Sequence, residues 1–125
     1  MESNVGLVLH TIMYNVLYVD DEPNLLELTK RFLETSNEFA IHTATSAKNA
    51  LEAGDLSIYD TIVSDYQMPG MDGIEFLKEV RLRFGDIPFI IFTGRGREEV
   101  VIEAINNGVN FISKRAGIRN HSLLN

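Results

Sequence analysis

Cysteine is absent from this 125-residue chain, and no apolar run in it is long. Without cysteine there is no disulfide framework, no thiolate metal site and no cysteine nucleophile, and the chain suits a reducing compartment. No stretch approaches the roughly 20 consecutive apolar residues that a membrane span needs. We therefore expect a cytoplasmic protein that does not enter a membrane.

Basic residues are also scarce, since 11 Lys and Arg stand against 18 Asp and Glu and give a formal net charge of −7. Direct nucleic-acid binding relies on Lys and Arg to neutralise phosphates, so this charge argues against DNA or RNA as a direct partner. The length fits one domain, which buries roughly two-thirds of its unfolded surface and needs no covalent staple.

The first residues differ from the rest. Segment 5–13 is apolar but short, follows Glu2 instead of a basic region, and lacks a small-residue cleavage site, which argues against a secretory signal. We predict that residues 1–13 are a poorly ordered extension. Residues 14–125 then form the folded domain, with a short or truncated last helix.

From Asn15 onward, short apolar runs alternate with helical patterns. The runs predict strands over 15–20, 39–44, 60–65, 88–92 and 109–112. Helices are expected to begin at Pro23, after Ser46, after Asp72 and near residue 97, because Pro suits the first helical position and Ser and Asp cap helix starts. Strict alternation of this kind predicts an α/β, doubly wound sheet of parallel strands.

The apolar spacing in each helix predicts which residues share a face. These sets are Leu25, Leu28 and Phe32 in the first helix; Ala47, Ala50 and Leu51 in the second; Ile74, Leu77, Val80 and Phe84 in the third; and Val101, Ala104 and Ile105 in the fourth. We expect Val100 and Ile102, which flank the fourth set, to be partly buried. Gly54, Gly85 and Gly108 are expected to end the last three helices.

Carboxylates stand where two of the predicted strands end: Asp20 and Asp21 at the first, and Asp65 at the third. In doubly wound sheets ligands bind beyond the carboxyl ends of the strands, so these acids can share one crevice. Like charges that close repel one another unless a cation neutralises them. Hard oxygen ligands suit Mg²⁺, which favours a site that it shares with phosphate.

Thr93 and Lys114 follow the fourth and fifth predicted strands and fall at the same edge. Taken singly, each has a simpler explanation: Thr93 as a loop cap, Lys114 as a solvated amine, and Asp65 as a turn residue before a Pro-Gly loop. Their joint occurrence favours a site. A carboxylate can act as a nucleophile toward a phosphoryl group, whose oxygens an ion, an ammonium and a hydroxyl would neutralise.

Four segments carry a resemblance to a known family: Val19-Asp20-Asp21-Glu22-Pro23, Asp65-Tyr66-Gln67-Met68-Pro69-Gly70-Met71-Asp72-Gly73, Phe92-Thr93-Gly94 and Phe111-Ile112-Ser113-Lys114. Over about residues 14–115 the chain resembles the receiver domain of two-component response regulators, the CheY-like family. The resemblance implies a flavodoxin-like, five-stranded parallel sheet of order 2-1-3-4-5 with helices on both faces.

By that resemblance, Asp65 is the phosphoacceptor, phosphorylated by a sensor histidine kinase in a Mg²⁺-dependent reaction. Asp21, Asp65 and the backbone carbonyl of Gln67 would ligate Mg²⁺, with Mn²⁺ as a substitute, while Asp20 would act through a bound water. The implied protein is no enzyme. It is a signalling domain that assists its own phosphotransfer and dephosphorylation, and its other partners would be a downstream protein or output domain and a possible second copy.

The same resemblance gives roles to the surrounding residues. Thr93 and Lys114 would contact phosphoryl oxygens, Thr93 and Phe111 would form the conformational switch, and Gln67 and Arg95 would tune hydrolysis. Phe111 is equally explained as a core aromatic of the last strand. The chain departs from the family in having Arg115 where Pro usually follows the lysine, and in the Gly and Asn content of residues 116–125.

Two other functions stay open from the sequence. A metal-dependent phosphohydrolase of the haloacid dehalogenase type would carry a second aspartate two residues after the nucleophile, and Gln67 stands at that position. A protein-binding module of the same fold that is never phosphorylated is the other alternative.

Overall fold

The structure, a computed structural model, describes residues 13–94 and 98–114. Residues 1–12 of the extension predicted over 1–13, the predicted last helix, Arg95 and Arg115 lie outside these ranges. The elements run in the order β1 Tyr14–Val19, α2 Pro23–Glu34, β2 Phe39–Ala44, α3 Ala47–Glu52, a 3-10 turn η1 Leu56–Ile58, β3 Thr61–Asp65, α4 Gly73–Phe84, β4 Phe89–Thr93, α5 Glu98–Asn106 and β5 Phe111–Lys114.

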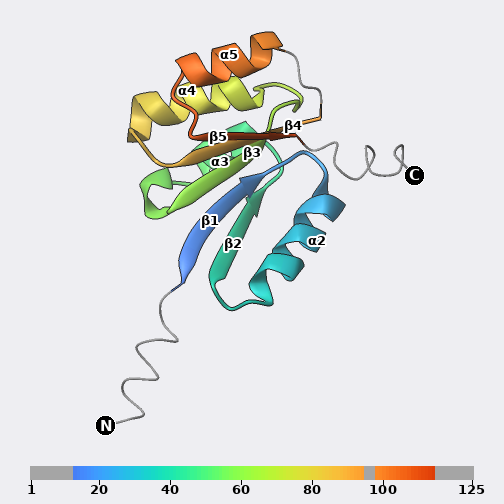
Figure 1. Cartoon of the computed structure of the whole chain (residues 1–125). Helices are drawn as coiled ribbons and strands as arrows, with labels where there is room; N and C mark the ends of the chain where they lie inside the picture. Colours follow the sequence, from blue (N-terminus) through green and yellow to red (C-terminus); the bar gives the residue numbers. More distant parts are fainter. Residues whose placement is uncertain (1–12, 95–97, 115–125) are drawn as a thin grey trace, which may run out of the picture.

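The strands form one parallel five-stranded sheet in the order β2-β1-β3-β4-β5. This order and the parallel pairing confirm the predicted doubly wound α/β fold. Figure 1 shows α2 beside β1 and β2, and α4 and α5 together on the other side of the sheet. No helix in residues 13–94 or 98–114 has the length and apolar character needed to cross a bilayer.

The larger core lies between the sheet and helices α3, α4 and α5. Its centre holds Ile62, Leu77 and Phe89, which are fully buried, and the rings of Phe76 and Phe89 meet edge to face with centroids 5.5 Å apart. The smaller core, on the opposite face, consists of Tyr18, Leu26 and Ile41 with α2 over it. Two cores on opposite faces hold the strand ends in place from both sides.

The predicted helix starts agree with the structure. Pro23 begins α2, Ser46 caps α3 by accepting a hydrogen bond from the Asn49 N–H, and Asp72 caps α4. The faces predicted for α3 and α4 are also confirmed, because Ala47, Ala50, Ile74, Leu77 and Val80 are buried and Leu51 and Phe84 contact the same core.

The face predicted for α2 is wrong. Leu28 and Phe32 are 66% and 73% exposed, and the fully buried residue of this helix is Leu26. The physical reason is that, among the described residues, α2 packs on the sheet through Leu26 and the partly buried Leu33. The stripe that contains Leu28 therefore turns away from the sheet.

The face predicted for α5 is displaced by one residue. Val100 and Ala104, spaced i and i+4, are buried, whereas Val101 is half-buried and Ile105 is exposed. The partial burial expected for Val100 and Ile102 is wrong too, since Val100 is buried and Ile102 is exposed. Apolar residues occupy adjacent positions here, and contact with α4 and β4 selects between the two stripes.

Candidate functional site

The candidate site lies at the carboxyl ends of β1, β3 and β4, which are neighbours in the sheet. In the register, Val19 lies beside Ser64 and Asp65 lies beside Phe92. Asp20, one residue after β1, therefore reaches the level of Asp65. Parallel pairing puts all three strand ends at one edge, as the sequence predicts.

Three carboxylates meet at this edge. Ligand oxygens of Asp20, Asp21 and Asp65 all lie within 4.8 Å of one another, and among the described residues these three form a group able to hold a metal ion. Asp20 and Asp65 are buried and Asp21 is exposed, so the cluster opens to solvent on one side. An all-oxygen, acidic donor set of this kind fits a hard divalent cation such as Mg²⁺.

The turn between β1 and α2 orients Asp20. The backbone N–H of Glu22 donates to Asp20 Oδ1 over 3.0 Å, and the hydroxyl of Tyr18 lies 3.5 Å from Asp20 Oδ2. Tyr18 was predicted only as part of an apolar strand, so its place beside the site was missed. Residues two apart on a strand share a face, and this spacing was the available signal.

Two backbone hydrogen bonds hold the loop after Asp65, one to β4 and one across the loop itself. The Tyr66 N–H donates to the Phe92 carbonyl over 2.7 Å, and the Gly73 N–H donates to the Tyr66 carbonyl over 2.8 Å. A Cβ atom on Gly73 would lie 2.4 Å from the Asp65 carbonyl oxygen, closer than real Cβ contacts come. Glycine at this place lets the start of α4 close against the backbone of Asp65.

A capping box completes this loop. The Asp72 side chain accepts from the backbone N–H groups of Ile74 and Glu75, while the Glu75 carboxylate accepts from the Asp72 N–H. A hollow of about 430 Å³, open to solvent, lies along this loop and is lined by Tyr66, Gln67, Met68, Pro69, Gly70 and Asp72. Gln67 is exposed on this loop.

Thr93 ends β4 and is buried beside β3, so its placement at the common edge agrees with the prediction. The backbone of Lys114 lies opposite Thr93 in the β4–β5 register. The side chain of Lys114 lies outside what the structure describes. Phe111 of β5 pairs with Ile90 of β4, and its side chain is 61% exposed, so in this structure it is no core residue.

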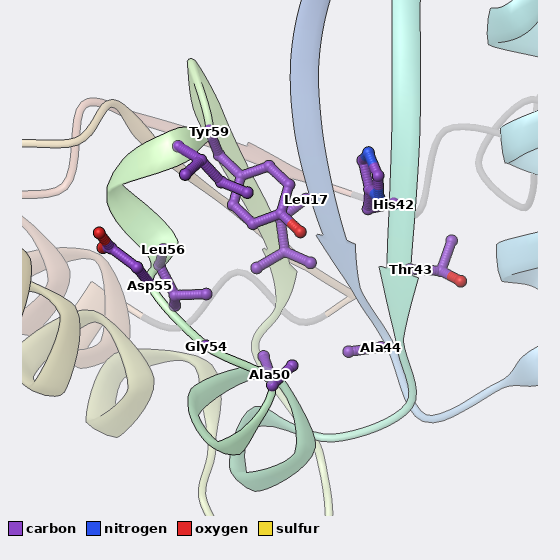
Figure 2. Close-up of a pocket in the computed structure, with 11 residues that line it drawn as sticks. Leu17, His42, Thr43, Ala44, Ala50, Gly54, Asp55, Leu56 and Tyr59 are labelled. Atoms are coloured by element: carbon purple, nitrogen blue, oxygen red, sulfur yellow. The ribbon is translucent and has the colours of Figure 1, made fainter.

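A separate cavity of about 300 Å³ lies away from the acids, between β2, α3 and η1. Figure 2 shows Leu17 and Ala50 at this cavity together with the rings of His42 and Tyr59, whose centroids are 5.5 Å apart. The short helix α3 ends at Glu52 and leaves this space open. No motif in the sequence marks this cavity, so it was not predicted.

Comparisons with known proteins agree with the geometry. The family model of the response regulator receiver domain matches residues 16–121. Response regulator Rre1 of Synechocystis is 34% identical over 103 residues, a match that covers 80% of this chain and 45% of that protein. The chain thus spans less than half the length of this curated relative.

Solved structures give the same result. Chemotaxis protein CheY4 of Vibrio cholerae is 28% identical with a TM-score of 0.76, and the match covers 82% of this chain and 87% of that one. The receiver domain of Francisella response regulator 1452 is 30% identical with a TM-score of 0.73, covering 82% and 84%. Fold, strand-end acids and the extent of the family match converge, and the chain belongs to the response regulator receiver domain family.

Proposed function

We propose that Asp65 is the phosphoacceptor of this chain. The chain is a receiver domain of two-component signal transduction, and phosphorylation on aspartate and partner binding are typical of its family. The observation that carries the proposal is the meeting of Asp20, Asp21 and Asp65 within 4.8 Å at one sheet edge. Asp65 is the member that ends a strand and precedes the loop closed by Gly73.

The proposed donor is a phosphohistidine on a cytoplasmic sensor kinase. A carboxylate oxygen of Asp65 attacks phosphorus, the P–N bond breaks, and its electron pair returns to the imidazole, which takes up a proton. Asp20, Asp21, Asp65 and the Gln67 backbone carbonyl would hold Mg²⁺, or Mn²⁺ in its place. When bound, that ion supplies positive charge to the phosphoryl oxygens.

Thr93 and Lys114 are the proposed phosphoryl contacts from this chain. The Thr93 hydroxyl would donate to one oxygen and the Lys114 ammonium to another. The position of Thr93 at the end of β4 and the register of Lys114 beside it support this assignment.

Gln67 and Arg95 are proposed to tune hydrolysis of the phosphoryl group, so Gln67→Ala and Arg95→Ala should each change the phosphoryl lifetime several-fold. Unchanged decay rates would remove both from the mechanism.

Phosphorylation is proposed to change the partner surface through Thr93 and Phe111. A ligand must favour one state by about 5.5 kcal/mol to move an equilibrium from mostly inactive to mostly active, and a charged hydrogen bond contributes about 1.5–3 kcal/mol. Contacts from Thr93 and Lys114 together approach that requirement. The exposed Phe111 would turn inward, and comparison of fluoroberyllate-bound and free forms tests this movement.

The deciding experiment is incubation with acetyl phosphate and Mg²⁺, followed by intact mass measurement. The native chain should gain one phosphoryl group, which chelator and Asp65→Asn should both abolish. A matched control is Asp72→Asn, because Asp72 lies in the same loop and caps α4. Phosphorylation that persists in Asp65→Asn and is lost in Asp72→Asn would overturn the assignment.

A further inference from the structure

Strand β2 forms one edge of the sheet, and its hydrogen-bonded neighbour is β1. An open edge presents backbone N–H and C=O groups to which another chain can add a strand. The carbonyls of Glu38 and Ala44 accept bonds from Tyr14 and Asp20 on the β1 side. Backbone groups alternate between the two sides of a strand. The residues of β2 whose backbone N–H and C=O groups point away from β1 are therefore Phe39, Ile41 and Thr43.

Side chains from α2 occupy the outward backbone groups of Ile41. The Ile41 N–H donates to Glu34 Oε2 over 2.9 Å, and the Ile41 carbonyl accepts from Lys30 Nζ over 2.9 Å. Lys30 Nζ and Glu34 Oε2 are themselves 3.0 Å apart. The ion pair thus offers one acceptor and one donor to the edge, as the backbone of a neighbouring strand would. Figure 1 shows α2 running beside β2.

The order of charges along α2 indicates that the Lys30–Glu34 pair does more than stabilise the helix. An i,i+4 pair stabilises a helix better when Glu precedes the basic residue, and here Lys30 precedes Glu34. The favourable order occurs in Glu27 and Arg31 on the same helix, a pair that is well exposed. The Ile41 N–H, and then Lys30, hold the pKa of Glu34 below its ordinary value, which agrees with a carboxylate engaged at the edge.

The capped residue is the middle one of the three that face outward. Two copies that paired their β2 edges antiparallel about a twofold axis at this residue would place Ile41 opposite Ile41 of the second copy. Such a pair exchanges both N–H···O bonds, and these need the same N–H and C=O that Glu34 and Lys30 occupy. The cap and the strand pairing therefore exclude one another.

We propose that Lys30 and Glu34 cap the outer edge of β2 and so prevent a second copy of this chain from pairing its own β2 there. The proposal does not depend on the role of Asp65. The buried Ile41 side chain, packed with Tyr18 and Leu26, keeps the edge in register for pairing once the cap is removed.

The test compares Lys30→Ala/Glu34→Ala with Glu27→Ala/Arg31→Ala. Both double variants remove one positive and one negative charge from α2 at i,i+4 spacing, and only the first pair contacts β2. Sedimentation velocity over a range of concentrations should show self-association roughly tenfold or more tighter in the first variant than in the control. Amide hydrogen exchange by NMR then locates the contact.

In the dilute first variant, the Ile41 amide should exchange at least about tenfold faster than in the control. At high concentration, the amides of Phe39, Ile41 and Thr43 should gain protection, while those of Ala40 and His42, which face β1, should not change. Equal self-association of the two variants, an Ile41 amide that exchanges no faster, or association without this alternating protection would overturn the proposal. If the double variant does not fold, Glu34→Ala alone, which removes the acceptor for the Ile41 N–H, is read by the same criteria.

Discussion

Gly73 lies so close to the backbone of Asp65, the proposed phosphoacceptor, that a residue with a side chain would clash there. We expect Gly73→Ala to destabilise the chain by about 1–3 kcal/mol, because its Cβ would lie 2.4 Å from the Asp65 carbonyl oxygen and one of the two must move. This outcome runs against intrinsic helix propensity, which favours Ala over Gly inside a helix. Urea unfolding followed by circular dichroism measures the change.

The control for this substitution is Gly94→Ala. A Cβ at Gly94 meets no described atom within 4 Å, so its effect should stay within about 0.5 kcal/mol. Equal stability of Gly73→Ala and the native chain would mean that the loop after Asp65 shifts at little cost. The close approach of α4 would then not be needed for the site.

Residue by residue, much of the candidate site could be predicted from the sequence. Asp20, Asp21, Asp65 and Thr93 lie at the predicted edge, because each directly follows or ends an apolar run whose strand character is local. Tyr18 could not be placed beside Asp20 from its residue type alone. Its position depends on the strand's face and on α2 above it, which are properties of the packed structure.

At the scale of elements, Arg81 joins three segments through one guanidinium. It donates to the carbonyls of Gly85, Ile87 and Gly108 and to Asn110 Oδ1 at 2.6–3.0 Å. Asn110 Oδ1 in turn accepts from the Phe89 N–H over 2.8 Å. The end of α4 and the approaches to β4 and β5 are thereby held together.

We expect Arg81→Ala to lower the free energy of unfolding by about 2–4 kcal/mol, since several carbonyls lose a charged donor. Arg81→Lys should keep little of this stability, because an ammonium cannot reproduce the planar fork. Arg83→Ala is the control: Arg83 also lies in the last turn of α4, but it is exposed and its ion pair is with the Glu79 carboxylate of the same helix, so a loss below about 1 kcal/mol is expected. Equal losses for Arg81→Ala and Arg83→Ala in urea titrations would contradict this role.

Helix faces show where local pattern stops being sufficient. In α3 and α4 the predicted stripe is buried, while Leu82, an apolar residue of α4 outside that stripe, is exposed. In α2 and α5 apolar residues occupy neighbouring stripes, for instance Leu25 and Leu26, or Val100 and Val101. Periodicity gives the spacing of each stripe, but the neighbouring strands decide which one packs.

For the molecule as a whole, the acid cluster should couple Mg²⁺ binding to stability. An ion that binds the folded chain but not the unfolded chain stabilises the fold by about 2.7 kcal/mol when the ion concentration is 100 times its dissociation constant. We expect the melting temperature to rise with Mg²⁺ and to return to its starting value with chelator. Asp21→Asn should lose most of this rise, and without the ion it should be slightly more stable than the native chain, because one of three clustered charges is gone.

Differential scanning calorimetry at several Mg²⁺ concentrations measures this coupling. The control is Asp60→Asn, because Asp60 lies at the opposite end of β3 and accepts a bond from the Asn15 N–H. Its melting temperature should still rise with Mg²⁺. An equal Mg²⁺ response in native chain and Asp21→Asn would remove Asp21 from the ion site.

Acid should destabilise the whole molecule partly through two carboxylates outside the site. The Ile41 N–H and Lys30 lower the pKa of Glu34 from its ordinary value of 4.5, and the Ser57 hydroxyl and N–H lower the pKa of Asp55 from 3.8. A carboxylate with a lowered folded pKa contributes stability above its ordinary value and loses it as pH falls through the folded pKa. Stability should therefore drop below about pH 4.5.

Urea titrations between pH 7 and pH 3 measure this dependence. Glu34→Gln and Asp55→Asn should each make stability fall less steeply as the pH drops below the ordinary pKa of the replaced carboxyl. Each substitution removes one group that binds a proton on unfolding. A pH profile that neither substitution alters would show that these contacts do not persist in solution.

The sequence by itself determined the local chemistry of this protein: which segments extend, where helices begin at Pro23, Ser46 and Asp72, and that acids, a threonine and a lysine follow strands that end at one edge. Only the tertiary structure decided which helix stripes are buried, how Arg81 joins distant loops, and that Lys30 and Glu34 close the edge at Ile41. The physical reason is the distance along the chain over which each kind of interaction acts. Strand and cap preferences arise within a few residues, whereas burial and backbone capping depend on atoms that are brought together only by packing of the whole sheet and its helices.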